Sequence, residues 1–361
     1  MGLKGPVPLM RDQRAHPLRV AQIPLYGGAA MYIGVDYHKK YIVATKMDES
    51  GTIMEQVRLN NDPDTLLGYA HTLPTGSKIA LEATEGWYHF YELLENQCPD
   101  IYLAHPLKTR AIAEARIKTD KVDSTMLAHL LRTNLLPHSY IPPREIRDMR
   151  EILRYRASLV SLRASIKNKV HAILSKNGIR MEYADIFGKK ALSSLGSLSL
   201  RSCYTIELMG YIQVGETLNA LIDKVSEVIE HQVKENPKAR LLLTIPGISY
   251  YSALLVISEI GDITRFPSAK KLCSYAGLVP QVYSSGGKTR YGSITKQGSK
   301  WLRWILVELS HHFIHADTKL EEMFRRVMLT HGKNTARVAV AREMLKIIYY
   351  MLRDNRPFMR R

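Results

Sequence analysis

The chain has 361 residues, of which 45% are hydrophobic and 24% are charged. This composition is typical of globular proteins and excludes an intrinsically disordered chain. Lysine and arginine number 51 against 34 aspartates and glutamates, and the net charge of +17 favours a polyanionic partner, most often nucleic acid.

The cysteines and the first residues bear on where the protein works. Cys98, Cys203 and Cys273 are far apart and belong to no Cys-x-x-Cys pair, which argues against a disulfide framework or a zinc ribbon and predicts a cytoplasmic protein. No apolar run approaches the roughly 18 residues that span a bilayer, so no membrane partner is expected. Residues 1–30 lack the apolar core of a secretory signal and are predicted to be a disordered tail, with Met31 a candidate start.

Residues 31–141 are predicted to form the first folded domain. Residues 31–47 are rich in β-forming side chains, residues 48–51 predict a turn, and residues 52–59 predict the returning strand. The elements that follow are a helix over 63–73, a strand over 78–82, a helix after Gly86, a strand over 101–104, and helices over about 107–117 and 121–133. A hairpin followed by alternating helices and strands is typical of an α/β layer fold.

Residues 142–236 are predicted to form a coiled-coil helical domain, which Pro142 and Pro143 separate from the first. Two apolar stripes with helical spacing predict an antiparallel helical hairpin, packed within one subunit or as a zipper between subunits. The first helix has no acidic residue from Ile152 to Met181, and its cations include Arg154, Arg163 and Lys167. A face of one sign suits a phosphate backbone, although it also serves simply to keep a helix soluble.

Residues 237–361 are predicted to be mainly helical, ending in helices over about 299–315 and 336–352. The turn Ile245-Pro-Gly247-Ile248 resembles the hairpin of helix-hairpin-helix elements, whose amides contact phosphate, and an ordinary Pro-Gly turn is the alternative. Residues 263–307 contain no acidic residue, and we expect four of their cations to hold a nucleic-acid backbone: Lys288, Arg290, Lys296 and Arg303.

Four carboxylates are candidates for one metal site. Asp36 lies inside an apolar strand and Glu82 ends another, while Asp120 and Asp123 are three residues apart on a predicted helix. Four hard oxygen donors suit Mg²⁺ or Mn²⁺, which activate phosphodiesters. The alternatives are a salt bridge or turn for Asp36 and a charge pair at a helix N-terminus for the two helical residues. Glu85 competes with Glu82 as a ligand, and Glu82 is preferred because it ends the apolar strand.

The stretch Tyr283-Ser-Ser-Gly-Gly-Lys-Thr-Arg-Tyr-Gly292 is the second candidate site. Its glycines allow close approach of a ligand, and its cations suit phosphate. A serine there attacks a phosphorus atom only if a base or metal activates it, and a flexible turn is the plain alternative.

Taken together, these motifs resemble the DEDD transposases of the insertion-sequence group that includes the Piv-type DNA invertases. Some members of that group are bridge-RNA-guided recombinases. The resemblance covers about residues 32–357 and rests on five stretches in a fixed order: Ile33-Gly-Val-Asp36, Leu81-Glu82-Ala83-Thr84, Lys118-Thr-Asp-Lys-Val-Asp123 with Leu127-Ala128, Ile245-Pro-Gly-Ile248, and Ala276-Gly-Leu-Val-Pro280 through Tyr283-Ser-Ser-Gly286.

The resemblance implies an RNase H-like (RuvC-like) N-terminal domain, a coiled-coil linker and a serine-bearing C-terminal domain. The four metal ligands map onto Asp36, Glu82, Asp120 and Asp123, and the nucleophile maps onto Ser285, with Ser284 one residue away. The family often has a small residue where this chain has Glu85, which leaves the choice of ligand open. It also implies assembly into dimers or tetramers and a structured noncoding RNA that pairs with donor and target DNA.

The sequence is therefore interpreted as a Mg²⁺-dependent transposase and site-specific DNA recombinase that acts through a serine–DNA intermediate. Two alternatives stay open at this point. One is a junction-resolving nuclease that uses water as the nucleophile, and the other is a non-catalytic nucleic-acid-binding protein.

Overall fold

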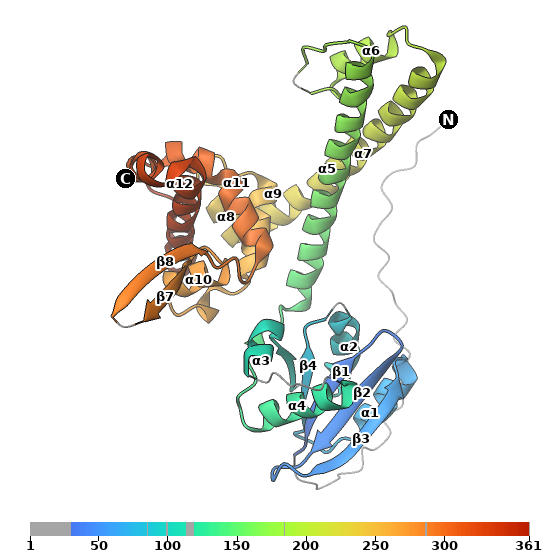
Figure 1. The fold of residues 1–361 in the computed structure, drawn as a ribbon, viewed down its shortest axis with the longest axis vertical. Helices are drawn as coiled ribbons and strands as arrows, with labels where there is room; N and C mark the ends of the chain where they lie inside the picture. Colours follow the sequence, from blue (N-terminus) through green and yellow to red (C-terminus); the bar gives the residue numbers. More distant parts are fainter. Residues whose placement is uncertain are drawn as a thin grey trace. The chain divides into compact units, whose positions relative to one another are not determined.

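The computed structural model describes residues 30–84, 86–98, 100–112, 119–183, 185–285 and 287–360. Residues 1–29 of the predicted tail, the competing ligand Glu85, and Gly286 lie outside these ranges. The chain divides into two compact units, Met1–Ile141 and Pro142–Arg361 (Figure 1).

The first unit has the predicted α/β layer arrangement and is built on a mixed sheet. Its six strands lie in the order β3-β2-β1-β4-β5-β6. The first three strands pair antiparallel, β1, β4 and β5 run parallel, and β6 returns antiparallel to β5. The strands are β1 (Tyr32–Tyr37), β2 (Tyr41–Met47), β3 (Ile53–Asn60), β4 (Lys78–Glu82), β5 (Ile101–Ala104) and β6 (His138–Ser139).

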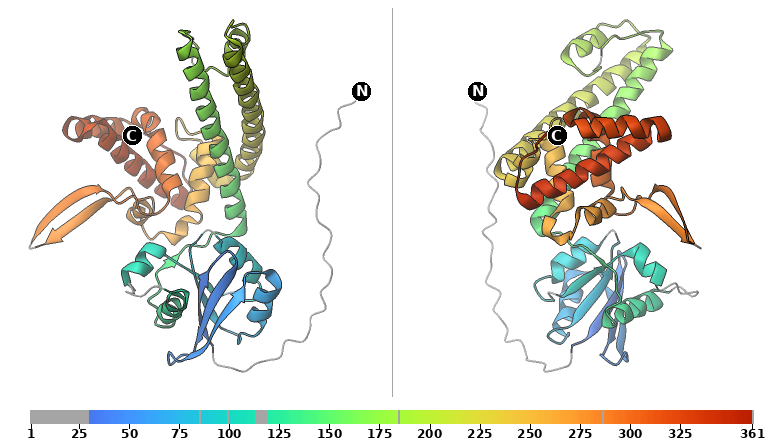
Figure 2. Two further views of the ribbon diagram at one scale, coloured as in Figure 1. Left: turned by 45° about the vertical axis from the view of Figure 1, so that its right-hand side comes forward. Right: turned by 90° about the vertical axis from the view of Figure 1, so that its left-hand side faces the viewer.

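Helices cover both faces of this sheet (Figure 2). On one face α1 (Pro63–His71) and α2 (Trp87–Leu94) pack against a core that includes Ile79 and Leu81 of β4. On the other face α4 (Asp120–Arg132) packs against Ala80, which lies between Ile79 and Leu81 in β4. Ala80 points to this face because successive side chains of a strand point to opposite faces of the sheet. The helix predicted over about 107–117 is described from Pro106 to Ile112, as α3, and the rest of it, residues 113–117, lies outside the described residues.

Gly34 lets α4 approach the middle of β1. A Cβ atom on Gly34 would lie 1.9 Å from the carbonyl oxygen of Ser124 and 2.5 Å from the amide nitrogen of Ala128. Both atoms are helix backbone, so a side chain could enter only if the whole helix moved. The glycine of the Ile-Gly-Val-Asp motif therefore sets how close Asp120 and Asp123 of α4 lie to the strand that carries Asp36.

Replacing Gly34 by alanine is expected to destabilise the first unit by about 1–3 kcal/mol, the usual cost of overpacking. Gly68 offers a matched control, because it lies in α1 of the same unit and an added Cβ would meet nothing within 4 Å. Gly68→Ala should instead be neutral or stabilising by up to about 1 kcal/mol, since alanine favours helix. Thermal unfolding followed by circular dichroism compares the two; equal melting temperatures would contradict the packing argument.

The second unit begins with the predicted helical hairpin. Helices α5 (Arg144–Lys176) and α7 (Ser202–Glu235) pack antiparallel, as the pairs Arg156–Ser226 and Arg163–Asn219 show. Leu159, Leu218 and Ile222 form a small core midway along the pair. The segment between the helices contains α6 (Lys189–Gly196), which closes the end of the hairpin through Leu195 and Phe187.

The remaining helices surround the largest core of the chain, which includes the nearly all-buried helix α9. They are α8 (Pro237–Leu242), α9 (Tyr250–Ile260), the 3-10 turn η1 (Ile263–Arg265), α10 (Ala269–Tyr275), α11 (Lys300–Ala316) and α12 (Thr318–Asp354). The element α12 consists of two helical segments that meet at a kink at Gly332, whose φ is 80°. The second segment contains the helix predicted over about 336–352, and the first begins after Asp317, whose carboxylate accepts hydrogen bonds from the amides of residues 319 and 320.

A two-stranded ribbon, β7 (Pro280–Ser285) and β8 (Lys288–Ile294), extends from these helices (Figure 2). Among the described helices, none is both long and apolar enough to span a membrane.

A candidate metal centre and a serine-bearing ribbon

The metal-site candidates of the first unit lie at the end of the central strands. Asp36 is the fifth residue of β1, and its side chain is 14% exposed. Val35 pairs with Leu81 in the parallel register, so Asp36 and Glu82 follow at the same end of neighbouring strands. Parallel strands bring their carboxyl ends to one edge of a sheet, which is why two strand-borne carboxylates from distant segments approach the same place.

Asp120 and Asp123 occupy the first turn of α4. Thr119 caps this helix by accepting a hydrogen bond from the amide of Val122 at 3.3 Å. Carboxylates in a first turn interact favourably with the helix dipole, so both residues suit this position in the helix. Asp123 lies close enough to Asp36 to raise the pKa of that carboxyl, together with Asp120.

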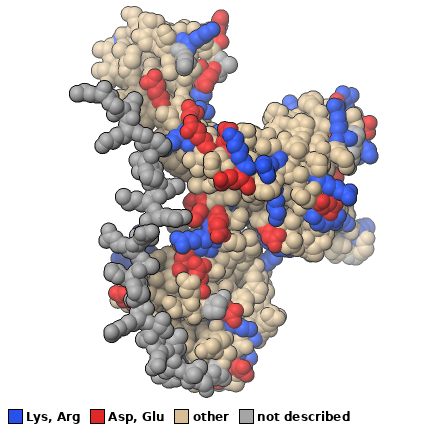
Figure 3. All heavy atoms as spheres, turned by 180° about the vertical axis from the view of Figure 1, so that it is seen from behind, with Lys and Arg blue, Asp and Glu red and all other residues tan. Residues whose placement is uncertain are grey.

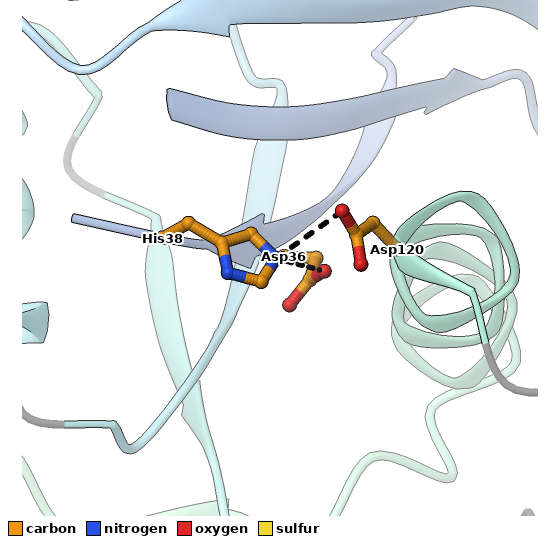
Figure 4. A group of neighbouring side chains, drawn as sticks. All are labelled: Asp36, His38 and Asp120. Atoms are coloured by element: carbon orange, nitrogen blue, oxygen red, sulfur yellow. Dashed lines mark hydrogen bonds and ion pairs between the residues drawn. The ribbon is translucent and has the colours of Figure 1, made fainter. Parts of the chain in front are cut away.

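His38 links the two aspartates (Figure 4). Its Nε2 atom lies 3.0 Å from Oδ2 of Asp36 and 3.4 Å from Oδ2 of Asp120. Ligand atoms of these three side chains all lie within 4.8 Å of one another, a grouping that can hold a metal ion. In the described parts of the chain, that grouping includes neither Glu82 nor Asp123.

The sequence did not single out His38 as a ligand, since a lone histidine is more often a packing or surface residue. The usable signal was its spacing: residues two apart on an extended segment point the same way, so Asp36 and His38 present side chains on one side. The sequence also missed Tyr41, whose hydroxyl donates a 2.9 Å hydrogen bond to Oδ2 of Asp120. The guanidinium of Arg58 lies 3.6 Å from the centre of the Tyr41 ring.

The two aspartates have opposite electrostatic environments. Burial raises the pKa of Asp36, and Asp120 and Asp123 add to that rise, although His38 opposes it. The hydrogen bond from Tyr41 lowers the pKa of Asp120, and His38 lowers it further. A buried carboxylate facing other carboxylates is costly without a cation, so this site favours a bound positive charge.

The raised pKa of Asp36 predicts a pH-dependent stability in metal-free protein. A carboxyl whose pKa is higher in the folded state stabilises the fold when protonated, and this contribution is lost as pH rises through the folded pKa. With chelator present, Asp36→Asn should therefore raise the melting temperature at pH 7 by about 1–3 °C. The gain should shrink toward pH 4, as thermal melts across this range would show.

Asp48 provides a control of opposite sign. Hydrogen bonds from Ser50 and Thr52 lower its pKa, so its charged form stabilises the turn and Asp48→Asn should lower the melting temperature at pH 7. A loss of stability in Asp36→Asn at every pH would mean that its bond to His38 outweighs burial and repulsion.

The serine candidate lies in the ribbon of the second unit. Ser285 ends β7 and is paired with Lys288, while Tyr283 is paired with Arg290. Directly paired residues and those two apart share a face, so Ser285, Lys288, Tyr283 and Arg290 lie on one face. Ser284 lies on the opposite face with Thr289, which its hydroxyl contacts at 3.4 Å.

Both faces of the ribbon are exposed, with Tyr283 at 62% and Tyr291 at 73% exposure. Gly287 makes the turn possible with a φ of 77°, and Gly292 leaves room beside the Tyr283 ring. The register thus distinguishes two serines that are adjacent in sequence: Ser285 shares its face with two cations, and Ser284 does not.

The predicted nucleic-acid contacts fall into two groups. Lys288, Arg290 and Lys296 are exposed. The other cations have partners within the second unit: Arg154 lies 3.2 Å from Glu259, Arg163 donates to Asn219, Lys167 lies 2.6 Å from Asp185, and Arg303 donates to the carbonyl of Ala276. Gly247 is also used structurally, because a Cβ atom there would lie 2.4 Å from Cβ of His312.

Glu259 is a structural residue that the sequence did not reveal. It is 3% exposed, and its carboxylate contacts Arg150, Arg154 and the hydroxyl of Ser299. The first helix of the hairpin is therefore held to α9 by its own cations. On the face drawn in Figure 3, basic and acidic side chains are interspersed, so the charge of +17 is not gathered into one patch there.

Comparison with known proteins agrees with this arrangement. Residues 33–177 match the DEDD transposase model of IS110-type elements, and residues 239–325 match the transposase model of the IS116/IS110/IS902 family. The chain carries transposase domains of the IS110/IS116 family. The first match spans Asp36, Glu82, Asp120 and Asp123, and the second spans Ser285.

Curated relatives of this transposase cover most of its length. It is 24% identical over 334 residues to the transposase of insertion sequence element IS1111A from Coxiella burnetii, with 89% of each chain covered. It is 27% identical over 345 residues to the pilin gene-inverting protein of Moraxella lacunata, covering 91% of this chain and 98% of that one. It is 25% identical to the transposase of element IS1328 from Yersinia enterocolitica, with 78% and 85% covered. Transposases of this family act as DNA recombinases, and the DEDD domain is RNase H-like.

Proposed function

We propose that this transposase cleaves and rejoins DNA through a covalent bond to Ser285, supported by a divalent cation at the DEDD site. One observation carries the proposal: carboxylates from β1 and the start of α4 converge with His38 on one small volume. Ser285 supports it as an exposed hydroxyl that shares a ribbon face with Lys288 and Arg290.

The donor set of the first unit fits Mg²⁺ or Mn²⁺. Asp36 and Asp120 supply hard carboxylate oxygens, His38 supplies an imidazole nitrogen, and Glu82 and Asp123 lie on the adjoining strand end and helix turn. A divalent cation bound there would polarise a phosphate oxygen and stabilise charge on the attacking and leaving oxygens. The desolvated Asp36 makes the site unfavourable without a cation, which supports this assignment.

In the proposed reaction, Oγ of Ser285 attacks the scissile phosphorus. A bond from phosphorus to the serine oxygen forms as the bond to a deoxyribose oxygen breaks. The serine hydroxyl gives up its proton, and the leaving oxygen takes one up. Because one phosphoester replaces another, rejoining needs no external energy source. Lys288 and Arg290, on the same ribbon face, neutralise the phosphates beside the reacting one.

Choice of DNA site is assigned to a structured noncoding RNA that pairs with donor and target strands, while the protein contacts backbone and shape. The net charge of +17 supports a polyanionic partner of either kind. We further propose that the first domain is RuvC-like and that the protein assembles into a homodimer or homotetramer through the coiled-coil hairpin. The helix-hairpin-helix-like turn is proposed to contact phosphate. The protein is proposed to act on DNA in the bacterial cytoplasm. Within the described chain, Lys288, Arg290 and Lys296 are the favoured backbone contacts, since Arg154, Arg163, Lys167 and Arg303 have internal partners.

Removing Lys288 and Arg290 is expected to weaken DNA binding and flatten its salt dependence. Each lost phosphate contact reduces the magnitude of the slope of log K against log salt by about 0.9. The slope of the double alanine variant should therefore be smaller in magnitude by about 1.8. Fluorescence anisotropy with labelled duplex DNA at several salt concentrations measures this slope.

A double variant with the same loss of charge serves as control. Arg325 and Lys234 are exposed and each is paired with a carboxylate four residues away. Alanine at these two positions should leave the slope nearly unchanged. If both double variants shift the slope equally, net charge alone and not the ribbon face controls binding.

A covalent-adduct assay tests the proposed chemistry. The protein is mixed with its native element, flanking DNA and the RNA transcribed from it, in Mg²⁺, then denatured. DNA that remains attached to protein supports the serine intermediate. Metal-dependent cleavage without an attached product would instead identify a nuclease that uses water.

A further inference from the structure

A pocket in the second unit combines aromatic rings, two cations and small side chains. It lies among α5, α9 and α11, has a volume of about 520 Å³, and has an almost entirely apolar lining. That volume lies within the range of roughly 300–1,000 Å³ that suits small organic groups. Its aromatic side chains are Tyr251, Trp301 and Trp304, and its cations are Arg156 and Lys300.

The aromatic wall is open to solvent. Trp304 is 42% exposed, and its ring meets that of Trp301 edge to face, with centroids 5.8 Å apart and planes at 84°. Helix α5 contributes Val160 and three small side chains, Ala157, Ser161 and Ala164, to the lining. An exposed tryptophan in a pocket that is otherwise lined largely by short side chains offers a broad flat surface. A planar ring can stack there and remove apolar surface from water.

Positive charge surrounds this apolar space. The guanidinium of Arg156 is positioned by a 2.8 Å hydrogen bond from Nε to the hydroxyl of Ser226, and it lies 4.5 Å from the centre of the Tyr251 ring. Lys300 is exposed at the start of α11, whose first turn has no acidic residue. No carboxylate lines the described pocket, and Glu259 nearby is already balanced by Arg150 and Arg154.

We infer that this pocket binds an unpaired nucleobase, stacked on Trp304, with the phosphates of the same strand held by Arg156 and Lys300. The chemistry required of the occupant is a flat apolar ring joined to negative charge, which a nucleotide provides. Bases stack on aromatic side chains whatever their sequence, because every base has a π face. The inference rests on the proposed function in one respect, that the ligand of this protein is nucleic acid.

Direct binding to oligonucleotides tests the pocket without any catalytic step. The chain has three tryptophans, so in full-length Trp87→Phe protein the tryptophan fluorescence, excited selectively over that of tyrosine, comes only from Trp301 and Trp304. A single-stranded oligonucleotide should quench this fluorescence. An abasic oligomer of the same length, with phosphates but no bases, should bind more weakly and quench little. Blunt duplex of the same sequence should also quench little, since its bases are paired.

Substitutions inside and outside the pocket lining test whether the single strand binds in the pocket. Trp304→Ala should weaken binding of the single strand about five- to a hundredfold, the loss typical of one stacked base, and should change duplex binding less than twofold. Ala164→Phe should fill the space and produce a similar loss. Ser158→Phe places the same ring on an exposed position of α5 outside the pocket lining, and it should bind like wild type.

Three results would overturn the inference. Equal losses for normal and abasic strands in Trp304→Ala would show that only phosphate contacts matter. Unchanged quenching and affinity in both pocket variants would place the base elsewhere. A change from oligomer to monomer in Trp304→Ala, measured by sedimentation without nucleic acid, would mean that a second protein chain covers the pocket.

The outcome can be separated from that of the proposed function. Ser285→Ala and Asp120→Asn remove groups assigned to chemistry and should leave quenching by the single strand intact. Failure of the adduct assay together with normal quenching would reject the serine mechanism and keep the base pocket. Normal adduct formation without quenching would reject the base pocket and keep the serine mechanism.

Discussion

Replacing Ser285 by alanine is expected to abolish the covalent protein–DNA product and to lower recombination by about 10⁴-fold or more, as removal of a nucleophile usually does. DNA binding should change little, because the substitution removes one exposed hydroxyl and leaves Lys288 and Arg290 in place. Recovery of recombined DNA and of protein-linked DNA from the same reaction gives both quantities, and anisotropy gives the affinity.

Ser284→Ala is the matched control for this substitution. It removes the same group from the adjacent residue, on the ribbon face that carries Thr289 and Tyr291. We expect recombination within about threefold of wild type, because that face lacks the two cations. If Ser284→Ala loses the adduct and Ser285→Ala keeps it, the nucleophile has been assigned to the wrong face. If neither loses it, the ribbon does not carry the nucleophile.

Asp120→Asn is expected to lower cleavage by roughly 10³-fold, since a catalytic cation typically contributes several kcal/mol and each 1.36 kcal/mol is tenfold. The change keeps the shape of the side chain and removes its charge, so α4 should stay folded. Stabilisation by Mn²⁺ should fall in parallel, because a ligand that binds the folded state raises its melting temperature. Melts with and without Mn²⁺ therefore report on the site independently of activity.

Tyr41→Phe distinguishes the role of a metal ligand from that of a residue that only positions the ligand. It removes only the hydroxyl that donates to Asp120 at 2.9 Å and leaves the carboxylate able to bind a cation. Its effect on cleavage should be smaller, about 10–100-fold, the usual range for a group that orients a ligand. Full activity in Asp120→Asn with normal stabilisation by Mn²⁺ would remove this residue from the metal site.

The α/β domain could be predicted from local pattern because its elements are short, regular and separated by clear turns. One carboxylate inside an apolar strand, another at the end of a strand and an acidic pair opening a helix indicated Asp36, Glu82, Asp120 and Asp123 without any structure. The approach of α4 to β1 was different. It depends on the missing Cβ of Gly34 against backbone atoms about 90 residues later in the chain, which periodicity cannot show.

The charge pattern along the sequence predicted less about contacts than the apolar pattern predicted about the fold. An acid-free run from Ile152 to Met181 predicted a phosphate-binding face. In the structure Arg154, Arg163 and Lys167 contact Glu259 of α9, Asn219 of α7 and Asp185 of the segment before α6. A count of charges along one helix contains no information about partners that packing brings to it.

By itself, the sequence determined the chemical inventory of this transposase: a basic chain, four carboxylates at strand and helix ends, and a serine beside glycines and cations. Only the tertiary structure decided which of these groups meet. It added His38 and Tyr41 to the acidic site, put Ser284 and Ser285 on opposite ribbon faces, and gathered Tyr251, Trp301 and Trp304 around one pocket. The reason is physical: residue type and local spacing set what a side chain can do, whereas its neighbours depend on strand register and helix packing between distant segments.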